Sequence, residues 1–259
     1  MSTFRQLHER GLLLLPNAWD AGSARLIESR GAQAIATTSA GVAWAAGYND
    51  GSRLPVAKLI ATVEAIARVV RVPITVDVEA GYSDDPSAVA ETVARVVAAG
   101  AVGINIEDGE GSPDLLAAKI AAAKRAAQRS GVDLFVNART DVFLAGLAPR
   151  EARVEETIAR AARYRDAGAD GLFVPCIAEA AEIEAVAKAV PMPLNVMWMP
   201  GLPSLAELEK LGVRRLSAGA AIPAIVLGIV ASSASSFLRN GTLDADRAMP
   251  YAEIAALFA

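Results

Sequence analysis

The stretch Ile74-Thr-Val-Asp-Val-Glu79, together with Gly103-Ile-Asn-Ile-Glu107, decides the fold that the sequence predicts. Both segments are short apolar runs that end in an acid, and the interval between them carries a helical pattern at Pro86–Ala99. Nearly continuous apolar runs of this length are typical of parallel strands that are buried on both faces. The two segments therefore indicate successive β/α units of a parallel sheet.

The same alternation continues along the whole chain. The predicted strands are Leu12–Leu15, Ala34–Thr38, Ile74–Glu79, Gly103–Glu107, Leu134–Arg139, Gly171–Pro175, Leu194–Trp198 and Arg215–Ala218. The predicted helices are Ala21–Arg30, Val56–Val70, Pro86–Ala99, Leu115–Gln128, Arg150–Ala167, Ala178–Ala189, Ser204–Leu211 and Ile222–Leu238, with an extra terminal helix at Tyr251–Phe258. Eight units in 259 residues match the usual size of a (β/α)₈ barrel.

The residues between the predicted helices and strands support this interpretation. Glycine stands within three residues of the end of several predicted helices, at Gly31, Gly100, Gly131, Gly168 and Gly212, where it tolerates the left-handed backbone that ends a helix. No linker divides the chain, so we expect a single α/β domain over residues 1–259, a (β/α)₈ TIM-type barrel with an extra C-terminal helix. A doubly wound open sheet would also alternate strands and helices, but the first strand is not followed by a GxGxxG motif.

The composition limits the classes of partner. The chain carries 25 Lys and Arg against 29 Asp and Glu, a formal net charge of −4. Nucleic acids and anionic membranes bind clustered basic residues, so we expect neither partner. The one cysteine, Cys176, excludes an internal disulfide, and the leucine run Leu12–Leu15 is too short for a signal peptide or a membrane span. We expect a cytoplasmic protein that binds a small molecule.

Acidic residues gather at the ends of neighbouring predicted strands. Asp77 and Glu79 lie two positions apart, so their side chains leave the same face of one strand, and Glu107 ends the next. Catalytic groups of (β/α)₈ barrels lie at these C-terminal strand ends. Converging carboxylates repel one another unless a cation compensates, and ligands that are all oxygen select a hard metal, Mg²⁺ or alternatively Mn²⁺. The competing interpretation is that these acids cap helices or pair with Arg139.

Other residue types narrow the chemistry. The only histidine, His8, precedes the first predicted strand, which disfavours a zinc or iron site with histidine ligands. No lysine falls at a predicted strand end, which disfavours a Schiff-base aldolase. Proton transfer would then fall to carboxylates, tyrosines, water, the substrate or Cys176. Cys176 is either a proton donor at the rim or a buried, inert thiol.

Five motifs, in order along almost the whole chain, resemble the isocitrate lyase/phosphoenolpyruvate mutase superfamily. They are PNAWDAGSARLIESRGAQAIATTSAG from Pro16, GYND from Gly47, VDVEAGY from Val76, GINIED from Gly103 and NARTD from Asn137. The resemblance implies a barrel enzyme in which Mg²⁺ chelates the carboxylate and 2-oxo group of a pyruvate-like unit. It also implies an enolate as the intermediate.

The resemblance assigns a metal site residue by residue. Asp77 matches the aspartate that binds Mg²⁺ most directly, and Glu79 matches an acid that usually acts through water. Glu107 matches the glutamate that completes the metal shell, and Asp50 matches an acid near the metal on the loop after the second strand.

The resemblance also assigns a substrate site. Ser39, Ala40 and Gly41 match the segment that grips a carboxylate or phosphonate, and Arg139 matches the arginine that binds the 2-oxo acid and its developing charge. Asn195 is a further, weaker candidate for substrate contact. The expected catalytic residues are Arg139, Asp50 and Glu107.

The segment Gly109–Leu115 departs from the best-known members. Isocitrate lyases carry a Lys-(Lys/Arg)-Cys-Gly-His loop here, whereas this segment has no Cys, His or Lys, and the gating-loop pattern of phosphoenolpyruvate mutases is absent too. Its two glycines, Gly109 and Gly111, allow either a mobile lid or an ordinary loop between a strand and a helix.

The sequence therefore predicts a Mg²⁺-dependent lyase that breaks a carbon–carbon bond of a small 2-oxo or 2-hydroxy dicarboxylic acid, with oxaloacetate the first substrate to try. The alternatives are a P–C bond enzyme, acting as a phosphonopyruvate hydrolase or a phosphoenolpyruvate mutase, and a non-catalytic barrel that binds 2-oxo acids. Members of the family often exchange their last helix between subunits, and the apolar run Ile222–Val230 exceeds the needs of one barrel helix. We expect a homo-oligomer, either a dimer or a tetramer.

Overall fold

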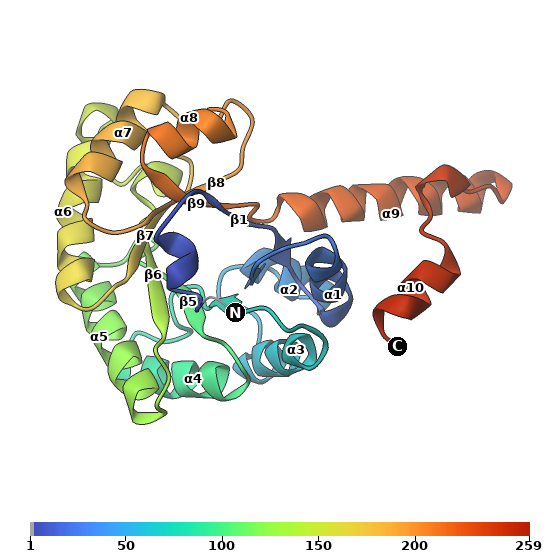
Figure 1. The fold of residues 1–259 in the computed structure, drawn as a ribbon, viewed down its shortest axis with the longest axis horizontal. Helices are drawn as coiled ribbons and strands as arrows, with labels where there is room; N and C mark the ends of the chain where they lie inside the picture. Colours follow the sequence, from blue (N-terminus) through green and yellow to red (C-terminus); the bar gives the residue numbers. More distant parts are fainter. Residues whose placement is uncertain (1–2) are drawn as a thin grey trace.

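A computed structural model describes residues 3–259 as a ring of strands surrounded by helices (Figure 1). The strands are β1 (Leu13–Leu15), β2 (Asn17–Ala18), β3 (Ile35–Thr37), β4 (Ile74–Asp77), β5 (Gly103–Glu107), β6 (Phe135–Arg139), β7 (Gly171–Val174), β8 (Leu194–Met197) and β9 (Val213–Ser217). The helices are α1 (Ala21–Ser29), α2 (Ser39–Ala45), α3 (Val56–Val69), α4 (Pro86–Ala98), α5 (Pro113–Arg129), α6 (Arg153–Asp166), α7 (Ala180–Ala189), α8 (Leu205–Lys210), α9 (Ala221–Asn240) and α10 (Tyr251–Leu257). The predicted strands and helices are thereby confirmed, with ends shifted by a few residues.

The sheet closes on itself. All neighbouring strands pair in parallel, in the order β1-β9-β8-β7-β6-β5-β4-β3-β2. β1 and β2 are two parts of one predicted strand, interrupted at Pro16, which has no backbone N–H to donate. β1 pairs with β9 and β2 pairs with β3, so this broken strand joins the two edges. The predicted barrel is confirmed, and the open, doubly wound sheet is excluded.

The N-terminal segment fills the barrel at the end where the strands begin. Phe4 and Phe135, at the start of β6, belong to a small apolar cluster inside the barrel. The His8 ring stacks on Phe135 with centroids 4.2 Å apart, and His8 Nδ1 lies 2.9 Å from the Phe4 carbonyl oxygen. Burial lowers the pKa of His8 to about 4, so the ring is neutral at neutral pH. His8 is a packing residue, remote from the strand ends where the acids gather.

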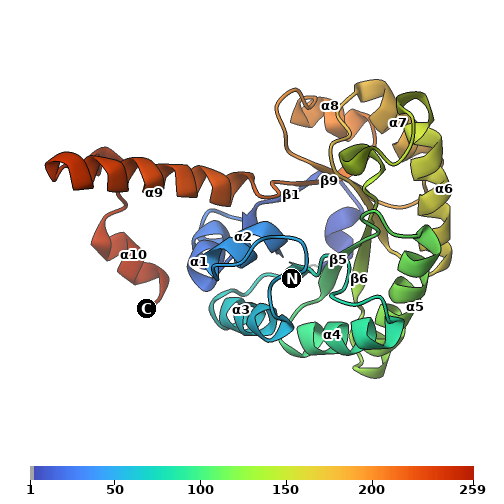
Figure 2. The same ribbon diagram turned by 180° about the vertical axis from the view of Figure 1, so that it is seen from behind.

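Two parts of the chain differ from the expected arrangement. Ser39–Gly41, expected only as a segment after the second strand, forms the first turn of a short helix, α2. The predicted last barrel helix forms as α9, but it projects away from the barrel instead of covering β9 and β1, and α10 turns back towards α1 (Figures 1 and 2). α9 is long and apolar enough to cross a membrane by length and composition. Its apolar side chains, among them Ile225, Leu227 and Val230, are largely exposed.

Gly103→Ala tests the packing at the end of the barrel where the strands begin. A methyl group at Gly103 would lie 2.7 Å from Phe4 Cε1 and 2.9 Å from Thr75 Oγ1, closer than such contacts allow. We expect a loss of about 1–3 kcal/mol in the free energy of unfolding, measured by denaturant titration, because overpacking forces neighbours out of position. Gly228→Ala in α9 is the control, since its methyl group would meet no atom within 4 Å. Equal free energies of unfolding for the two variants would contradict this account of the packing around Gly103.

Candidate active site

Three consecutive strands deliver charged groups to one rim of the barrel. Asp77 ends β4, Glu107 ends β5 and Arg139 ends β6, and Glu107 is in register with Arg139. Arg139 Nη1 lies 2.7 Å from Glu107 Oε2. Because parallel strands place their carboxyl ends on one side of the barrel, the expected acids and the expected arginine come together here.

Asp77 is a buried acid at the rim. Its Oδ1 accepts the N–H of Glu79 at 3.2 Å and its Oδ2 accepts the N–H of Ser39 at 3.4 Å, while its own N–H donates to Thr37 Oγ1 at 2.9 Å. Burial raises the pKa of Asp77, and the nearby charge of Arg139 opposes that rise. The carboxylate thus connects β4 to the first turn of α2.

Glu79 lies just beyond β4 in a strained backbone conformation. Its φ is +51°, and Ser52 and Tyr82 beside it also have positive φ values. Its carboxylate accepts a hydrogen bond from the Ser52 N–H and another from Tyr82 Oη at 2.9 Å. Such strain is retained where surrounding contacts fix the chain, and it gathers at functional sites. Burial raises the pKa of Glu79, and the negative charges of Asp50 and Asp77 add to the rise.

Asp50 lies on the exposed loop between α2 and α3. Burial is the main cause of the raised pKa values of Asp77, Glu79 and Tyr82, and the negative charge of Asp50 adds to each rise. The hydrogen bond from Ser52, two residues further on, holds this loop against Glu79. This contact brings the loop that carries Asp50 next to the rim.

Glu107 and Arg139 share an unbalanced cluster of charge. Burial raises the pKa of Glu107 to about 8, Arg139 opposes the rise, and the charges of Asp77, Asp141 and Glu79 add to it. Arg139 donates from Nε to Asp141 Oδ1 at 2.6 Å and from Nη2 to Asp141 Oδ2 at 2.9 Å. Burial lowers the pKa of Arg139, but the carboxylates of Glu107 and Asp141 outweigh that effect and leave it raised. One guanidinium thus faces several buried carboxylates.

Asp77, Glu79 and Glu107 suit a hard divalent cation, although their side chains do not stand in the geometry of a formed metal site. Over residues 3–259 no three Asp, Glu, His or Cys side chains stand at the spacing of a formed metal site. Glu107 Oε2 is buried without a hydrogen bond of good geometry, even though Arg139 Nη1 is close to it. Asp77, Glu79 and Glu107 all have raised pKa values, so a positive charge among them would relieve their repulsion. Their oxygen-only donor set fits Mg²⁺ or Mn²⁺.

The first turn of α2 faces the same rim. The N–H groups of Ala40 and Gly41 lie in that first turn, where a helix offers no internal acceptor, while the N–H of Ser39 is directed at Asp77. Gly41 allows the close packing of this turn, since a methyl group there would lie 2.8 Å from Thr38 Cγ2 and 2.9 Å from Trp19 Cβ. The turn can therefore receive an anionic group beside Asp77.

Asn195 is not brought to the rim with the other candidates. Its side chain is fully buried inside the barrel, where Oδ1 accepts from Asn137 Nδ2 at 3.1 Å and Nδ2 donates to Ser217 Oγ at 3.1 Å. Its amide is thus occupied by hydrogen bonds to residues of neighbouring strands.

Cys176 has a positive φ, like Glu79, and is half-buried near Arg139. Burial raises the pKa of its thiol. Cys176 therefore remains protonated at neutral pH.

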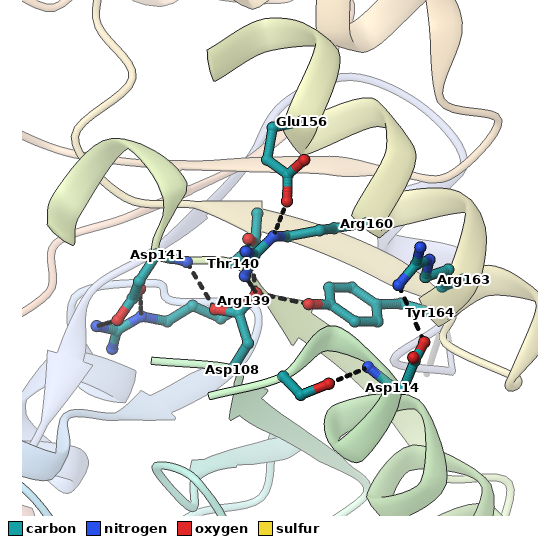
Figure 3. Close-up of polar contacts among 10 residues, drawn as sticks. Asp108, Asp114, Arg139, Thr140, Asp141, Glu156, Arg160, Arg163 and Tyr164 are labelled. Carbon is teal, nitrogen blue, oxygen red and sulfur yellow. Dashed lines mark hydrogen bonds and ion pairs between the residues drawn. The ribbon is translucent and has the colours of Figure 1, made fainter. Parts of the chain in front are cut away.

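The segment after β5 forms a tight turn. Gly111 N–H donates to the Asp108 carbonyl oxygen at 2.8 Å, Gly109 has a φ of +51°, and α5 begins at Pro113. In this structure the segment Gly109–Ser112 forms the short connection between β5 and α5. Asp108, the residue before Gly109, begins this turn. Its carboxylate is fully buried and accepts several hydrogen bonds (Figure 3).

Comparisons with known proteins agree with this architecture. Residues 4–238 match the family model described as phosphoenolpyruvate phosphomutase. The solved structure of a candidate phosphonomutase from Burkholderia cenocepacia J2315 is 46% identical, with a TM-score of 0.85, over 90% of this chain and 97% of that one. The uncharacterized protein Rv1998c of Mycobacterium tuberculosis is 40% identical over 98% of this chain and 95% of the relative. Oxaloacetate decarboxylase of Paraburkholderia xenovorans is 30% identical over 92% of this chain and 82% of the enzyme.

The raised pKa of Glu107 predicts a pH-dependent stability of the metal-free protein. The folded state holds this proton up to about pH 8, whereas an unfolded chain releases it near 4.5, so the folded state binds more protons across that window. The free energy of unfolding should therefore fall as the pH rises from 5 to 8. Glu107→Gln should remove this part of the fall and raise the midpoint of thermal unfolding at pH 8 by about 2–4 °C relative to wild type.

The measurement is thermal unfolding in the presence of a chelator at several pH values. Glu110→Gln, at an exposed acid three residues further on, is the control and should follow the wild-type curve. Parallel curves for Glu107→Gln and wild type would mean that Glu107 ionises normally.

Proposed function

The chain belongs to the phosphoenolpyruvate phosphomutase family and is an enzyme of the isocitrate lyase/phosphoenolpyruvate mutase superfamily, and on that premise we propose that it is a Mg²⁺-dependent carbon–carbon lyase. The proposed substrate is a small 2-oxo or 2-hydroxy dicarboxylic acid, with oxaloacetate first. The observation that carries the proposal is the meeting of Asp77, Glu107 and Arg139 at three adjacent strand ends.

Asp77, with Glu79 and Glu107 beside it, would hold the cation. When bound, Mg²⁺ would neutralise the carboxylates and stabilise negative charge on the C2 oxygen of the substrate. Ala40 and Gly41 would bind a substrate carboxylate through their first-turn N–H groups. Asp50 would face the metal from the loop between α2 and α3.

Arg139 is the residue that would meet the charge produced by the reaction. In oxaloacetate the bond between C3 and the C4 carboxylate breaks and its electron pair forms the C2–C3 double bond, while the π pair of the carbonyl moves onto the C2 oxygen and CO₂ leaves. The enolate then takes up a proton at C3. The guanidinium of Arg139, fixed by Asp141, supplies preorganised donors for the negative charge, and such donors stabilise a transition state without reorganising. Breaking this bond needs no protein acid at the leaving group, which agrees with a turn at Gly109–Ser112 that carries no Cys, His or Lys.

A second candidate function is P–C bond chemistry on phosphonopyruvate. The similarity to the candidate phosphonomutase of Burkholderia cenocepacia favours it. The first turn of α2 would then hold the phosphonyl group in place of a carboxylate. We further propose a cytoplasmic setting, on the acidic charge balance and the single cysteine.

We also propose that α9 pairs two copies of the chain. Leu227 and Val230 in α9 are 50% and 56% exposed, and Leu14 on β1 is 46% exposed although it lies in a barrel strand. A groove of about 660 Å³ beside β1 and α1 is lined by apolar residues that include Leu12, Leu14 and Ile27. The place of an eighth barrel helix is left open in this chain, because α9, which is long and apolar enough for that place, projects outwards (Figure 2). A reciprocal exchange of α9 between two copies covers both apolar surfaces at once.

The lyase proposal predicts release of pyruvate from oxaloacetate that depends on Mg²⁺ and Arg139. Pyruvate is measured by coupling to NADH oxidation, with a blank that contains Mg²⁺ without protein because metal ions alone decarboxylate oxaloacetate. Arg139→Lys keeps the charge but loses the paired contact with Asp141, and we expect a loss of about 10²–10³ in kcat. Arg163→Lys, at the exposed ion pair with Asp114, should act like wild type.

Release of phosphate from phosphonopyruvate, without pyruvate from oxaloacetate, would replace the lyase with the second candidate. Tight binding of a 2-oxo acid without turnover on either substrate would identify a non-catalytic binding barrel. A protein that binds no 2-oxo acid in the presence of Mg²⁺ would contradict all three assignments.

The pairing proposal predicts that charge on α9 separates the copies. Leu227→Glu with Val230→Glu should convert the oligomer into monomers, because two buried charges would face the apolar groove without partners. The mass in solution is measured by light scattering during gel filtration. Gln128→Glu on the exposed face of α5 is the control for added charge and should keep the wild-type mass. A wild-type monomer, or an oligomer unchanged by the double substitution, would contradict the exchange.

A further inference from the structure

Asp108, the residue that follows β5, is the centre of a buried hydrogen-bond network behind the rim (Figure 3). Its side chain is 0% exposed. Its Oδ1 accepts the backbone N–H of Asp141 at 2.9 Å. Its Oδ2 accepts from Thr140 Oγ1 at 2.7 Å, from Arg160 Nη1 at 2.9 Å and from Tyr164 Oη at 2.5 Å. Four donors from the end of β6 and from α6 thus converge on one carboxylate.

These contacts hold the chain segment that carries Arg139. The Asp108 N–H donates to the carbonyl oxygen of Arg139 at 3.2 Å. The two oxygens of the Asp108 side chain accept hydrogen bonds from Thr140 and Asp141, the two residues that follow Arg139. Asp141, whose N–H is held by Asp108, in turn holds the Arg139 guanidinium through two hydrogen bonds. A continuous path therefore runs from Asp108 through Asp141 to Arg139, and from there to Glu107.

The network requires a carboxylate at position 108. Oδ2 alone faces three donors, and an amide nitrogen in its place would direct its own hydrogens at them. Arg160 balances the buried charge and is itself held by Glu156 at 2.6 Å, which links the network to the surface of α6. Burying an ion pair costs desolvation energy, and packing alone is satisfied at lower cost by apolar side chains. The network therefore serves geometry more than stability.

We propose that Asp108 is a positioning residue for the reaction: through Asp141 it fixes the direction of the Arg139 guanidinium towards the bound 2-oxo acid. The inference rests on the proposed function, because it assumes that Arg139 contacts such an acid. Asp108 does not touch the substrate. Its effect on catalysis passes through Arg139, and misplacement of such a group by about 1 Å can lower the rate on the order of 100-fold.

The test compares Asp108→Asn with Asp114→Asn, a change of the same type at an aspartate that is 80% exposed. The binding probe is oxalate, a planar dianion that mimics an enolate of pyruvate, titrated calorimetrically with Mg²⁺ present. We expect Asp108→Asn to weaken oxalate binding roughly tenfold or more and to lower kcat more than it raises KM. Asp114→Asn should match wild type. Both variants are first checked for a wild-type circular dichroism spectrum.

A double-mutant cycle separates positioning from general stability. If Asp108 acts through Arg139, adding Asp108→Asn to Arg139→Lys should cause little further loss of oxalate affinity, because the group it positions is already altered. Additive losses would overturn the proposal. If Asp108→Asn does not fold, Tyr164→Phe replaces it, since it removes one donor and leaves three. This milder change should still weaken oxalate binding about threefold and should show the same non-additivity with Arg139→Lys.

The outcomes of the two proposals differ. Wild-type protein that fails to bind oxalate with Mg²⁺ would contradict the proposed function itself. Wild-type protein that binds oxalate while a folded Asp108→Asn variant binds it equally well would leave the proposed function standing and refute the positioning role.

Discussion

The structure depends on the balance of buried charge around Arg139. Its guanidinium ends β6 and lies against Glu107 and Asp141, and its charge also reaches Asp77. Three carboxylates against one guanidinium leave an excess of negative charge in a place where burial already penalises ions. Burial is the largest cause of the raised pKa of Glu107, and the neighbouring carboxylates add to the rise. A site with this imbalance can bind a cation strongly, and this property links the architecture to the proposed chemistry.

The barrel creates this imbalance and also limits it. Parallel pairing brings the ends of β4, β5 and β6 side by side, so acids that are about thirty residues apart in the chain become neighbours. The backbone N–H groups of Ser39 and Glu79 then offset part of the charge of Asp77. Behind the rim, Asp108 and Arg160 form a balanced pair with all their nearest groups bonded. The Asp108 carboxylate behind the rim is thus bonded through both oxygens, whereas Glu107 Oε2 at the rim has no hydrogen bond of good geometry.

The sequence predicted the elements and the identity of the rim acids, because both depend on local pattern. Apolar runs locate strands wherever they lie, and the residue that ends a parallel strand must appear at the rim. The sequence did not predict where α9 would lie, because its pattern records an apolar surface and not the partner of that surface. It also did not predict the role of Asp108, whose partners Arg160 and Tyr164 are 52 and 56 residues away in the chain. Asn195 was a candidate for substrate contact because it lies on a predicted strand. Its side chain is instead buried in the interior of the barrel, where it accepts a hydrogen bond from Asn137.

The two kinds of buried acid at the end of β5 show how function and stability divide between adjacent residues. Glu107 points to the rim with one oxygen lacking a well-formed hydrogen bond, and Asp108 points away from it with both oxygens bonded. Successive residues of a strand face opposite sides, so one strand end supplies both groups without any insertion. If the rim were satisfied as completely as Asp108 is, no charge would remain for a cation to neutralise. If Asp108 were as poorly satisfied as Glu107, the direction of Arg139 would vary. The precision of Arg139 would then come from behind the site, through Asp108, the residue that follows Glu107.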